Sequence, residues 1–196
     1  MSAIEPQSAI VQAIPPAAVQ SAVDMQWTET LRDGTSVLIR PIRDEDAERE
    51  RRFIEALTPE SRRFRFLGGM TGASPALLKQ LVHIDHASEA AFVAVGAEDG
   101  DFLGVSRYSA RSDGLSCECA VTVSDEWHDK GLATLLMHHL VEVARRRGIR
   151  SMYSLDAADN VGMRALAEHL GFTRKADPDD STLVIHTLDL PQATTT

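Results

Sequence analysis

A mixed α/β sheet flanked by helices is the fold class that the sequence predicts, with an antiparallel meander followed by a parallel β–α–β region. Three apolar segments in the middle of the chain are joined by short turns containing Asp-Gly, as in antiparallel strands. After them the spacing of apolar residues changes to that of a helix, and another apolar segment follows. The chain has 196 residues, of which 43% are apolar and 25% charged, so it is long enough for one domain with its own core.

Helices dominate the first part of the predicted domain. A β-branched strand follows the turn formed by Asp33 and Gly34 and ends at Pro41. Asp44 is placed to cap the next helix, and two later helices begin with Thr-Pro and Ser-Pro pairs, which suit a cap and a first helical position. The expected elements are a strand at residues 37–39 and helices at 44–57, 60–66 and 75–83.

The second part alternates strands and helices. Leu132, Leu135, Leu136 and Leu140 recur at helical spacing, and three consecutive Arg residues before Gly148 suit the end of that helix. Because a helix lies between two strands here, those strands are expected to run parallel. The expected strands cover residues 91–97, 102–109, 115–123, 152–155 and 182–188, and the expected helices cover 132–147 and 160–170.

The two ends of the chain are expected to lie outside the domain. Residues 1–26 contain no Lys or Arg and are rich in Ala, Gln and Pro, which is typical of a flexible arm rather than a secretory signal. The alternative is a short strand or helix that docks on a partner subunit through Ile10, Val11 and Ile14 and forms a homodimer. The organised domain is expected at residues 27–190, followed by a tail at 191–196.

The charge of the chain disfavours some classes of partner. There are 20 Lys and Arg residues against 29 Asp and Glu, and the resulting net charge of −9 argues against general binding to nucleic acid or to an anionic membrane. It suits a cationic partner such as an amine. No apolar run approaches the roughly 18 residues that a membrane span needs, so we expect a cytoplasmic protein.

Neither a disulfide framework nor a metal site is expected. Cys117 and Cys119 are the two cysteines, and thiols buried in a strand usually serve packing rather than redox chemistry. His83 and His86 have the spacing of a pair of metal ligands, but no third or fourth ligand is evident.

A strand, a loop and the start of a helix follow one another between Glu118 and Thr134. Unpaired amides at a helix start carry partial positive charge and bind phosphate, and small residues such as Gly131 and Ala133 let a phosphate come close. The segment has neither the Gly-Lys-Ser/Thr of a Walker A loop nor the Gly-x-Gly-x-x-Gly of a dinucleotide-binding fold.

Residues 123–133 resemble motif A of the GNAT superfamily of acyl-CoA-dependent N-acyltransferases. The family signature Gln/Arg-x-x-Gly-x-Gly/Ala falls on His128, Gly131 and Ala133, and Asn160 with the helix ending in Leu-Gly-Phe looks like the second signature. The first half, with its Asp-Gly, Leu-Ile-Arg-Pro-Ile and Thr-Pro-Glu-Ser segments, is similar to the GNAT domain of Pat-type bacterial protein lysine acetyltransferases. The resemblance covers about residues 28–190 and implies the GNAT fold.

The resemblance also implies acetyl-CoA as cosubstrate and assigns residues to it. Main-chain groups of Val121 and Val123 would pair with the pantetheine arm, and Asn160 would bind the pantetheine or the reacting end. His128 stands where the family has Gln or Arg. The amides that would cradle the pyrophosphate belong to Asp129, Lys130, Gly131, Leu132, Ala133 and Thr134. The carboxylate of Asp129 adds negative charge there, which Lys130 would offset.

Glu118 is the residue expected to act as general base. Successive residues of a strand face opposite sides, so Glu118 shares a side with Ala120 and Thr122, away from both thiols. In Pat-type enzymes the Glu of a Glu-x-Ala-Val run is the base, and this chain has Glu-Cys-Ala-Val. A base is needed because a lysine amine with a pKa of about 10.4 is neutral in only about one molecule in 2,500 at pH 7. The alternative is a solvated strand residue or an ion-pair partner.

The expected reaction is acetyl transfer from acetyl-CoA to a primary amine, with an amide near Val121 stabilising the oxyanion. The Pat-like first half suggests a protein lysine as acceptor, whereas the negative net charge suits a small cationic amine equally well. Many GNAT enzymes have a Tyr seven residues after the Asn that protonates the leaving thiolate, and here that position is Ala167. Together with His128 and Asp129, this substitution leaves open a non-catalytic module that binds acyl-CoA.

Overall fold

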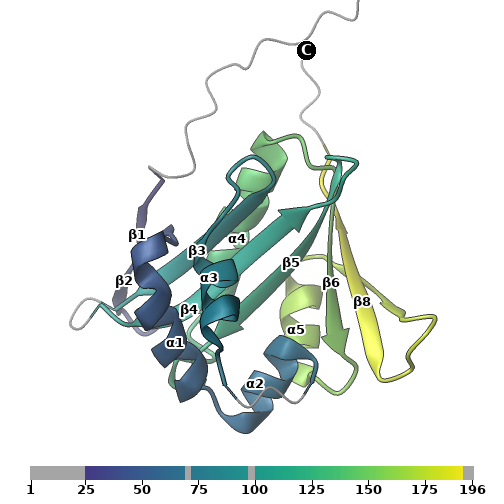
Figure 1. Cartoon of the computed structure of the whole chain (residues 1–196). Helices are drawn as coiled ribbons and strands as arrows, with labels where there is room; N and C mark the ends of the chain where they lie inside the picture. The colour runs from purple at the N-terminus through teal and green to yellow at the C-terminus, as the bar shows by residue number, and fades with distance from the viewer. Residues whose placement is uncertain (1–24, 69–71, 97–99, 192–196) are drawn as a thin grey trace, which may run out of the picture.

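The computed structural model describes residues 25–68, 72–96 and 100–191. Its strands form one eight-stranded sheet in the order β1-β2-β3-β4-β5-β6-β8-β7 (Figure 1). Within these residues only β5 and β6 run parallel, which confirms the predicted mixed sheet. The strands are β1 (Trp27–Thr30), β2 (Ser36–Pro41), β3 (Glu89–Val95), β4 (Phe102–Ala110), β5 (Ser116–Val123), β6 (Ser151–Ala157), β7 (Thr173–Ala176) and β8 (Leu183–Asp189).

The helices begin close to where the sequence predicts them. Thr58 and Ser74 cap α2 and α3, since their hydroxyl oxygens accept hydrogen bonds of 3.2 Å from the amides of Ser61 and Leu77. The helices are α1 (Ala47–Ala56), α2 (Pro59–Phe66), α3 (Pro75–Val82), α4 (Leu132–Arg146) and α5 (Val161–His169), with 3-10 turns η2 (Asp44–Asp46) and η3 (Asp125–Trp127). The predicted arm and tail lie outside the described residues, apart from Met25, Gln26 and Pro191.

Helices cover both faces of the sheet (Figure 1), and each face carries its own hydrophobic core. On one face α4 packs on the sheet, and on the other α1 and α3 pack on it. Alternate residues of β3 divide between the two cores, with Phe92 in the α4 core and Val93 in the α1–α3 core. The α4 packing is close, because a Cβ at Gly104 of β4 would lie 2.9 Å from Cδ1 of Leu136 and 3.1 Å from the backbone oxygen of Thr122.

Two local predictions need correction, and part of a third lies outside the described residues. The short edge strands β1 and β7 were not expected, and Asp44 opens the 3-10 turn η2 rather than α1. The cause of this tight turn is Asp46, whose fully buried carboxylate accepts hydrogen bonds from the guanidinium of Arg40 and from the amide of Arg43. The predicted end of the third strand, Ala97, lies outside the described residues.

The parallel pair β5–β6 opens toward the carboxyl ends of its strands. Ladder pairing joins residues 116–118 of β5 to residues 151–153 of β6. From Cys119 to Val123 the described strand β5 keeps its pairing with β4 but has none with β6. The backbone groups on that edge of β5 are therefore available to a ligand, and the starts of α4 and α5 follow these two strands.

Candidate active site

A cavity of about 800 Å³ lies at the opening between β5 and β6. Its lining comes from β5, the starts of α4 and α5, α2 and the β1–β2 turn. Besides Glu118, it includes every residue predicted to hold the cosubstrate except Lys130, namely Val121, Val123, His128, Asp129, Gly131, Leu132, Ala133, Thr134 and Asn160. The fold thus brings Asn160 next to residues 118–134, although α4 and β6 lie between them in the sequence.

Glu118 is exposed and faces the side of β5 predicted from strand alternation, while Cys117 and Cys119 are buried on the other side. Tyr153, its register partner on β6, donates a hydrogen bond from Oη to Oε2 of Glu118 at 3.3 Å. Arg111 in turn donates from Nη1 to the same Oη at 2.9 Å. The carboxylate is therefore held at the cavity by a chain of two hydrogen bonds that begins at a cation.

The start of α4 is shaped by two residues in the left-handed region. Gly131 is the N-cap with φ of 87°, and Asp129 has φ of 60°. Glycine adopts this conformation without strain, and its missing side chain leaves the first amides of α4 open to a ligand. A Cβ at Gly131 would lie 3.3 Å from Nε of Arg32, so even a methyl group would crowd this point.

The side chains of His128 and Lys130 make contacts that the motif does not predict. The ring of His128 donates a hydrogen bond from Nε2 to the carbonyl oxygen of Val123 at 3.0 Å, which ties the loop to the end of β5. Lys130 lies over the ring of Trp127 and pairs with the carboxylate of Asp33 at 3.2 Å. The ammonium group of Lys130 thus pairs with Asp33 rather than with Asp129.

Asn160 caps α5 from within the cavity. Its Oδ1 accepts a hydrogen bond from the amide of Met163 at 2.9 Å. Its side-chain nitrogen has no partner among the residues that the structure describes, so this amide group is free to donate a hydrogen bond to a ligand.

Several lining residues were missed by the sequence reasoning. Asp156 of β6 lines the cavity, and its Oδ2 accepts hydrogen bonds from Oγ of Ser154 at 2.5 Å and from Nδ1 of the buried His186 at 2.8 Å. A carboxylate at the end of a strand, directly after Leu155, is a signal that could have marked Asp156. Arg32 and Arg65 carry no such signal, since their place at the cavity depends on contacts between distant segments.

Helix α2 borders the cavity and is attached at two points. Asp125 in η3 accepts hydrogen bonds from the amide and hydroxyl of Thr58, at 3.1 and 3.0 Å, and from the hydroxyl of Ser61 at 2.7 Å. Partial burial opposes ionisation of Asp125, but these hydrogen bonds outweigh it and hold the pKa of the carboxyl below its usual value. The guanidinium of Arg63 pairs with Asp159 at 2.8 Å, next to the cap of α5.

Arg65 of α2 faces the cavity near a second guanidinium. Burial and the charge of Arg107 lower the pKa of Arg65 to about 10, while the carboxylate of Glu50 opposes this shift. Burial also raises the pKa of Glu50, against the effect of the two arginines. Arg65 thus stays charged at neutral pH.

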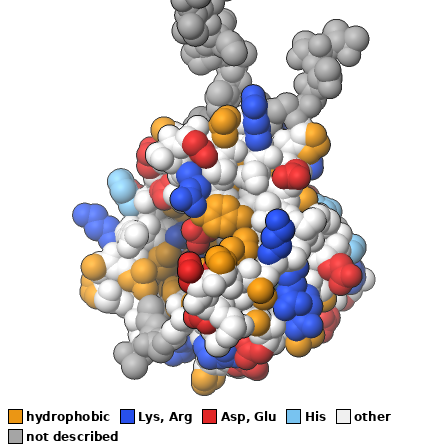
Figure 2. All heavy atoms as spheres, turned by 90° about the vertical axis from the view of Figure 1, so that its right-hand side faces the viewer, with side chains coloured by type: hydrophobic (Ala, Val, Ile, Leu, Met, Phe, Trp, Pro, Cys, Tyr) orange, Lys and Arg blue, Asp and Glu red, His pale blue; other side chains and the backbone are white. Residues whose placement is uncertain are grey.

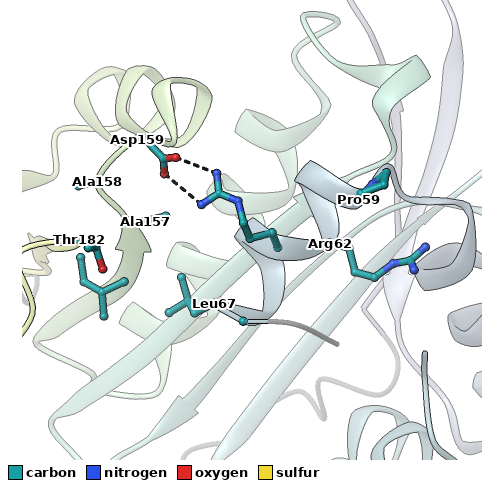
Figure 3. Close-up of a pocket in the computed structure, with 10 residues that line it drawn as sticks. Pro59, Arg62, Leu67, Ala157, Ala158, Asp159 and Thr182 are labelled. Atoms are coloured by element: carbon teal, nitrogen blue, oxygen red, sulfur yellow. Dashed lines mark hydrogen bonds and ion pairs between the residues drawn. The ribbon is translucent and has the colours of Figure 1, made fainter. Parts of the chain in front are cut away.

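A second cavity, of about 700 Å³, lies on the other side of α2 (Figure 3). Pro59 and Arg62 of α2 border it together with Leu67, which follows that helix. Ala157 at the end of β6 and Thr182 just before β8 also border it. The Arg63–Asp159 pair, dashed in Figure 3, crosses from one wall to the other. Figure 2 shows a face of the molecule on which apolar side chains line a hollow with acidic and basic side chains at its rim.

The remaining candidate chemistry is not supported by the geometry. Burial raises the pKa of the Cys117 thiol to about 12 and that of Cys119 well above its usual value, so thiolate chemistry is disfavoured. In the described ranges no three His, Cys, Asp or Glu side chains are arranged to hold a metal ion. None of the described helices is long and apolar enough to cross a membrane.

Comparisons with known proteins agree with this geometry. The model of the acetyltransferase (GNAT) family matches residues 51–172. Acetyltransferase PA5475 of Pseudomonas aeruginosa is 55% identical over 166 residues, which cover 84% of this chain and 89% of that protein. Acetyltransferase Pat of Mycolicibacterium smegmatis is 26% identical over 72% of this chain, and the match spans 42% of Pat.

Solved structures extend the likeness to the fold. The GNAT domain of S. lividans PAT superposes with a TM-score of 0.78 at 28% identity, covering 84% of this chain and 97% of that domain. A cAMP-binding acyltransferase from Mycobacterium smegmatis superposes with a TM-score of 0.61 at 22% identity over 48% of its length, which shows the fold alone. The predicted resemblance and fold are thereby confirmed. From its motifs, its sheet and these matches, the chain belongs to the acetyltransferase (GNAT) family.

Proposed function

We propose that this protein transfers an acetyl group from acetyl-CoA to a primary amine, the side chain of a protein lysine, with Glu118 as the general base. The observation that carries the proposal is the position of Glu118. It is an exposed carboxylate that lines the cavity beside the last paired residues of β5 and β6. Proteins of the family use acetyl-CoA and an amine acceptor. A carboxylate at this point is therefore placed to take the proton of the amine.

The described residues suit acetyl-CoA. The amides and carbonyls of its pantetheine arm match the unpaired edge of β5 from Cys119 onward, as an added strand would. The carbonyl oxygen of Val123 already accepts one hydrogen bond from His128 and keeps a second lone pair for another donor. The amides at the start of α4, beside Gly131, suit the pyrophosphate, and the free amide nitrogen of Asn160 suits a carbonyl oxygen.

The proposed chemistry needs one proton acceptor. At pH 7 the lysine amine carries an extra proton, and reaching its neutral form costs about 4.6 kcal/mol. Glu118 accepts that proton directly or through water, and the nitrogen attacks the carbonyl carbon of the thioester. An amide near Val121 donates to the oxygen that gains charge. The C–S bond then breaks, the sulfur leaves with the electron pair, and the second proton of the attacking nitrogen passes to this thiolate or to water.

Two kinds of acceptor remain to be separated by experiment. The likeness to the GNAT domain of S. lividans PAT supports a protein lysine. The net charge of −9 favours a cationic acceptor of either kind, so a small polyamine is the second candidate. Turnover measured in parallel on lysine-containing peptides and on polyamines distinguishes them.

The test of Glu118 is the variant Glu118→Gln, with Glu126→Gln as the matched control. Glu126 is exposed and does not line the cavity. We expect kcat of Glu118→Gln to fall about 10²- to 10⁴-fold, while the Kd for acetyl-CoA from calorimetry stays within about twofold. The control should keep full activity. Equal turnover in both variants would remove Glu118 from the mechanism, and acetyl-CoA binding without turnover of any acceptor by the unmodified protein would favour a binding module.

A further inference from the structure

Arg32 lies against the start of α4, although it belongs to the turn between β1 and β2. Its amide donates a hydrogen bond to the carbonyl oxygen of Lys130 at 3.2 Å. Its side chain crosses the face of Gly131, where a Cβ would lie 3.3 Å from Nε, 3.5 Å from Cγ and 3.7 Å from Cδ. Arg32 also lines the cavity. The contact therefore places a guanidinium beside the helix start that suits an anion.

The guanidinium of Arg32 is not committed to another group. The structure gives it no hydrogen bond or ion pair with any described residue, and the side chain is exposed. Lys130, its neighbour across the turn, is paired with Asp33 instead. A free guanidinium at the rim of a cavity can donate two parallel hydrogen bonds to one phosphate group.

The other charged groups near the start of α4 do not supply a cation to a phosphate, whereas Arg32 does. The carboxylate of Asp129 is exposed and would repel a phosphate, and the ring of His128 is turned to the carbonyl of Val123. Among the lining residues only Arg32 and Arg65 are Lys or Arg, and Arg65 comes from α2. Of these two, Arg32 is the one that contacts Gly131.

We propose that Arg32 binds the pyrophosphate of acetyl-CoA, together with the first amides of α4. The proposal rests on acetyl-CoA being the cosubstrate. Its positive charge would offset the carboxylate of Asp129, and its side chain uses the space that Gly131 leaves open. The motif alone does not predict this contact, because Arg32 is about a hundred residues away from Gly131 in sequence.

The experiment is a calorimetric titration of the whole chain with CoA, 3′-dephospho-CoA and pantetheine. The variants are Arg32→Gln, Arg32→Lys and the control Arg174→Gln, which removes the same charge from an exposed position on β7 that lines neither large cavity. For Arg32→Gln we expect Kd to rise about 10- to 100-fold with both CoA and 3′-dephospho-CoA and to stay unchanged with pantetheine. Arg32→Lys should fall between, and Arg174→Gln should match the unmodified protein. Thermal unfolding confirms that each variant is folded.

Each outcome decides the proposal. An equal loss of affinity with CoA and 3′-dephospho-CoA supports the pyrophosphate assignment. A loss with CoA alone would move the contact to the 3′-phosphate and overturn it, as would unchanged affinity in Arg32→Gln while the unmodified protein binds CoA. If the unmodified protein binds neither nucleotide, the proposed cosubstrate fails first and this proposal fails with it.

Discussion

The attachment of α2 to Asp125 predicts a measurable loss of stability in Asp125→Ala. The change removes three hydrogen bonds to one carboxylate, from the amide and hydroxyl of Thr58 and the hydroxyl of Ser61. Hydrogen bonds to charged groups contribute about 1.5–3 kcal/mol each when well buried. These three hydrogen bonds are partly exposed, and water can replace them in part. We therefore expect the free energy of unfolding to fall by about 2 kcal/mol in total. For a chain of this size that lowers Tm by about 4–8 °C.

Two further variants make the prediction specific. Glu126→Ala removes the same charge from the adjacent position and should leave Tm unchanged within about 1 °C. Asp159→Ala breaks the pair with Arg63, in which both side chains are largely exposed, and should cost about 0–1 kcal/mol. Urea unfolding of all three proteins gives the free energies. In Asp125→Ala the α2 amides should exchange with solvent faster than the loss of global stability alone would produce, as measured by hydrogen exchange.

If Asp125→Ala and Glu126→Ala lose equal stability, the three hydrogen bonds contribute nothing beyond the removal of a charge. If Asp125→Ala is destabilised but α2 exchanges no faster than β3, then Asp125 acts on the whole fold rather than on the wall of the cavity. Either result would contradict the role of Asp125 in holding α2 against the site.

Three other predictions follow from single contacts. Tyr153→Phe should lower kcat less than Glu118→Gln, because it removes one hydrogen bond that positions the Glu118 carboxylate but leaves the carboxylate itself in place; a kcat as low as that of Glu118→Gln contradicts it. The thiol of Cys117 should resist a thiol reagent at pH 8 until urea unfolds the protein, since burial raises its pKa to about 12, so rapid labelling of the native state would count against burial. Asp46→Ala should cost about 3–5 kcal/mol in urea unfolding by leaving the buried charge of Arg40 unpaired, and a loss below about 1 kcal/mol would refute this.

The central elements could be predicted because each has a local cause. Gly148 and Gly171 end α4 and α5 with φ of 82° and 84°, a conformation that glycine adopts readily. The meander from β3 to β5 follows from apolar segments too close together for any other pairing. Where a helix or strand is determined by its own residues, the sequence pattern and the structure agree.

The two edge strands could not be predicted because their cause lies elsewhere in the chain. Trp27 places β1 by stacking on His139 of α4 at 4.0 Å and by an edge contact with Phe92 at 5.3 Å. All residues of β7 are exposed, so no alternation of apolar side chains marks it as a strand. Such strands form against a sheet that already exists.

The same distinction applies to the candidate site. Strand alternation placed Glu118 on the exposed side of β5, and the motif placed Gly131 at the start of α4, because both are local features. The contact of Arg32 with Gly131, the chain from Arg111 through Tyr153 to Glu118, and the pair of Asp156 with His186 join separate segments. A single sequence contains no pattern that fixes such pairs.

The alanine at position 167 bears on how the leaving sulfur is handled. Ala167 is 4% exposed and lines a void of about 20 Å³ between α5, β5 and α4, so a tyrosine side chain could enter only by displacing its neighbours. A thiol with a pKa near 8.5 leaves as its thiolate at pH 7 for about 2 kcal/mol, whereas the lysine amine loses its proton for about 4.6 kcal/mol. The lack of a general acid for the thiolate therefore raises the barrier by less than the lack of a general base for the amine would. Under the proposed mechanism, Glu118 takes part in the more costly of the two proton transfers, and the less costly one needs no protein side chain.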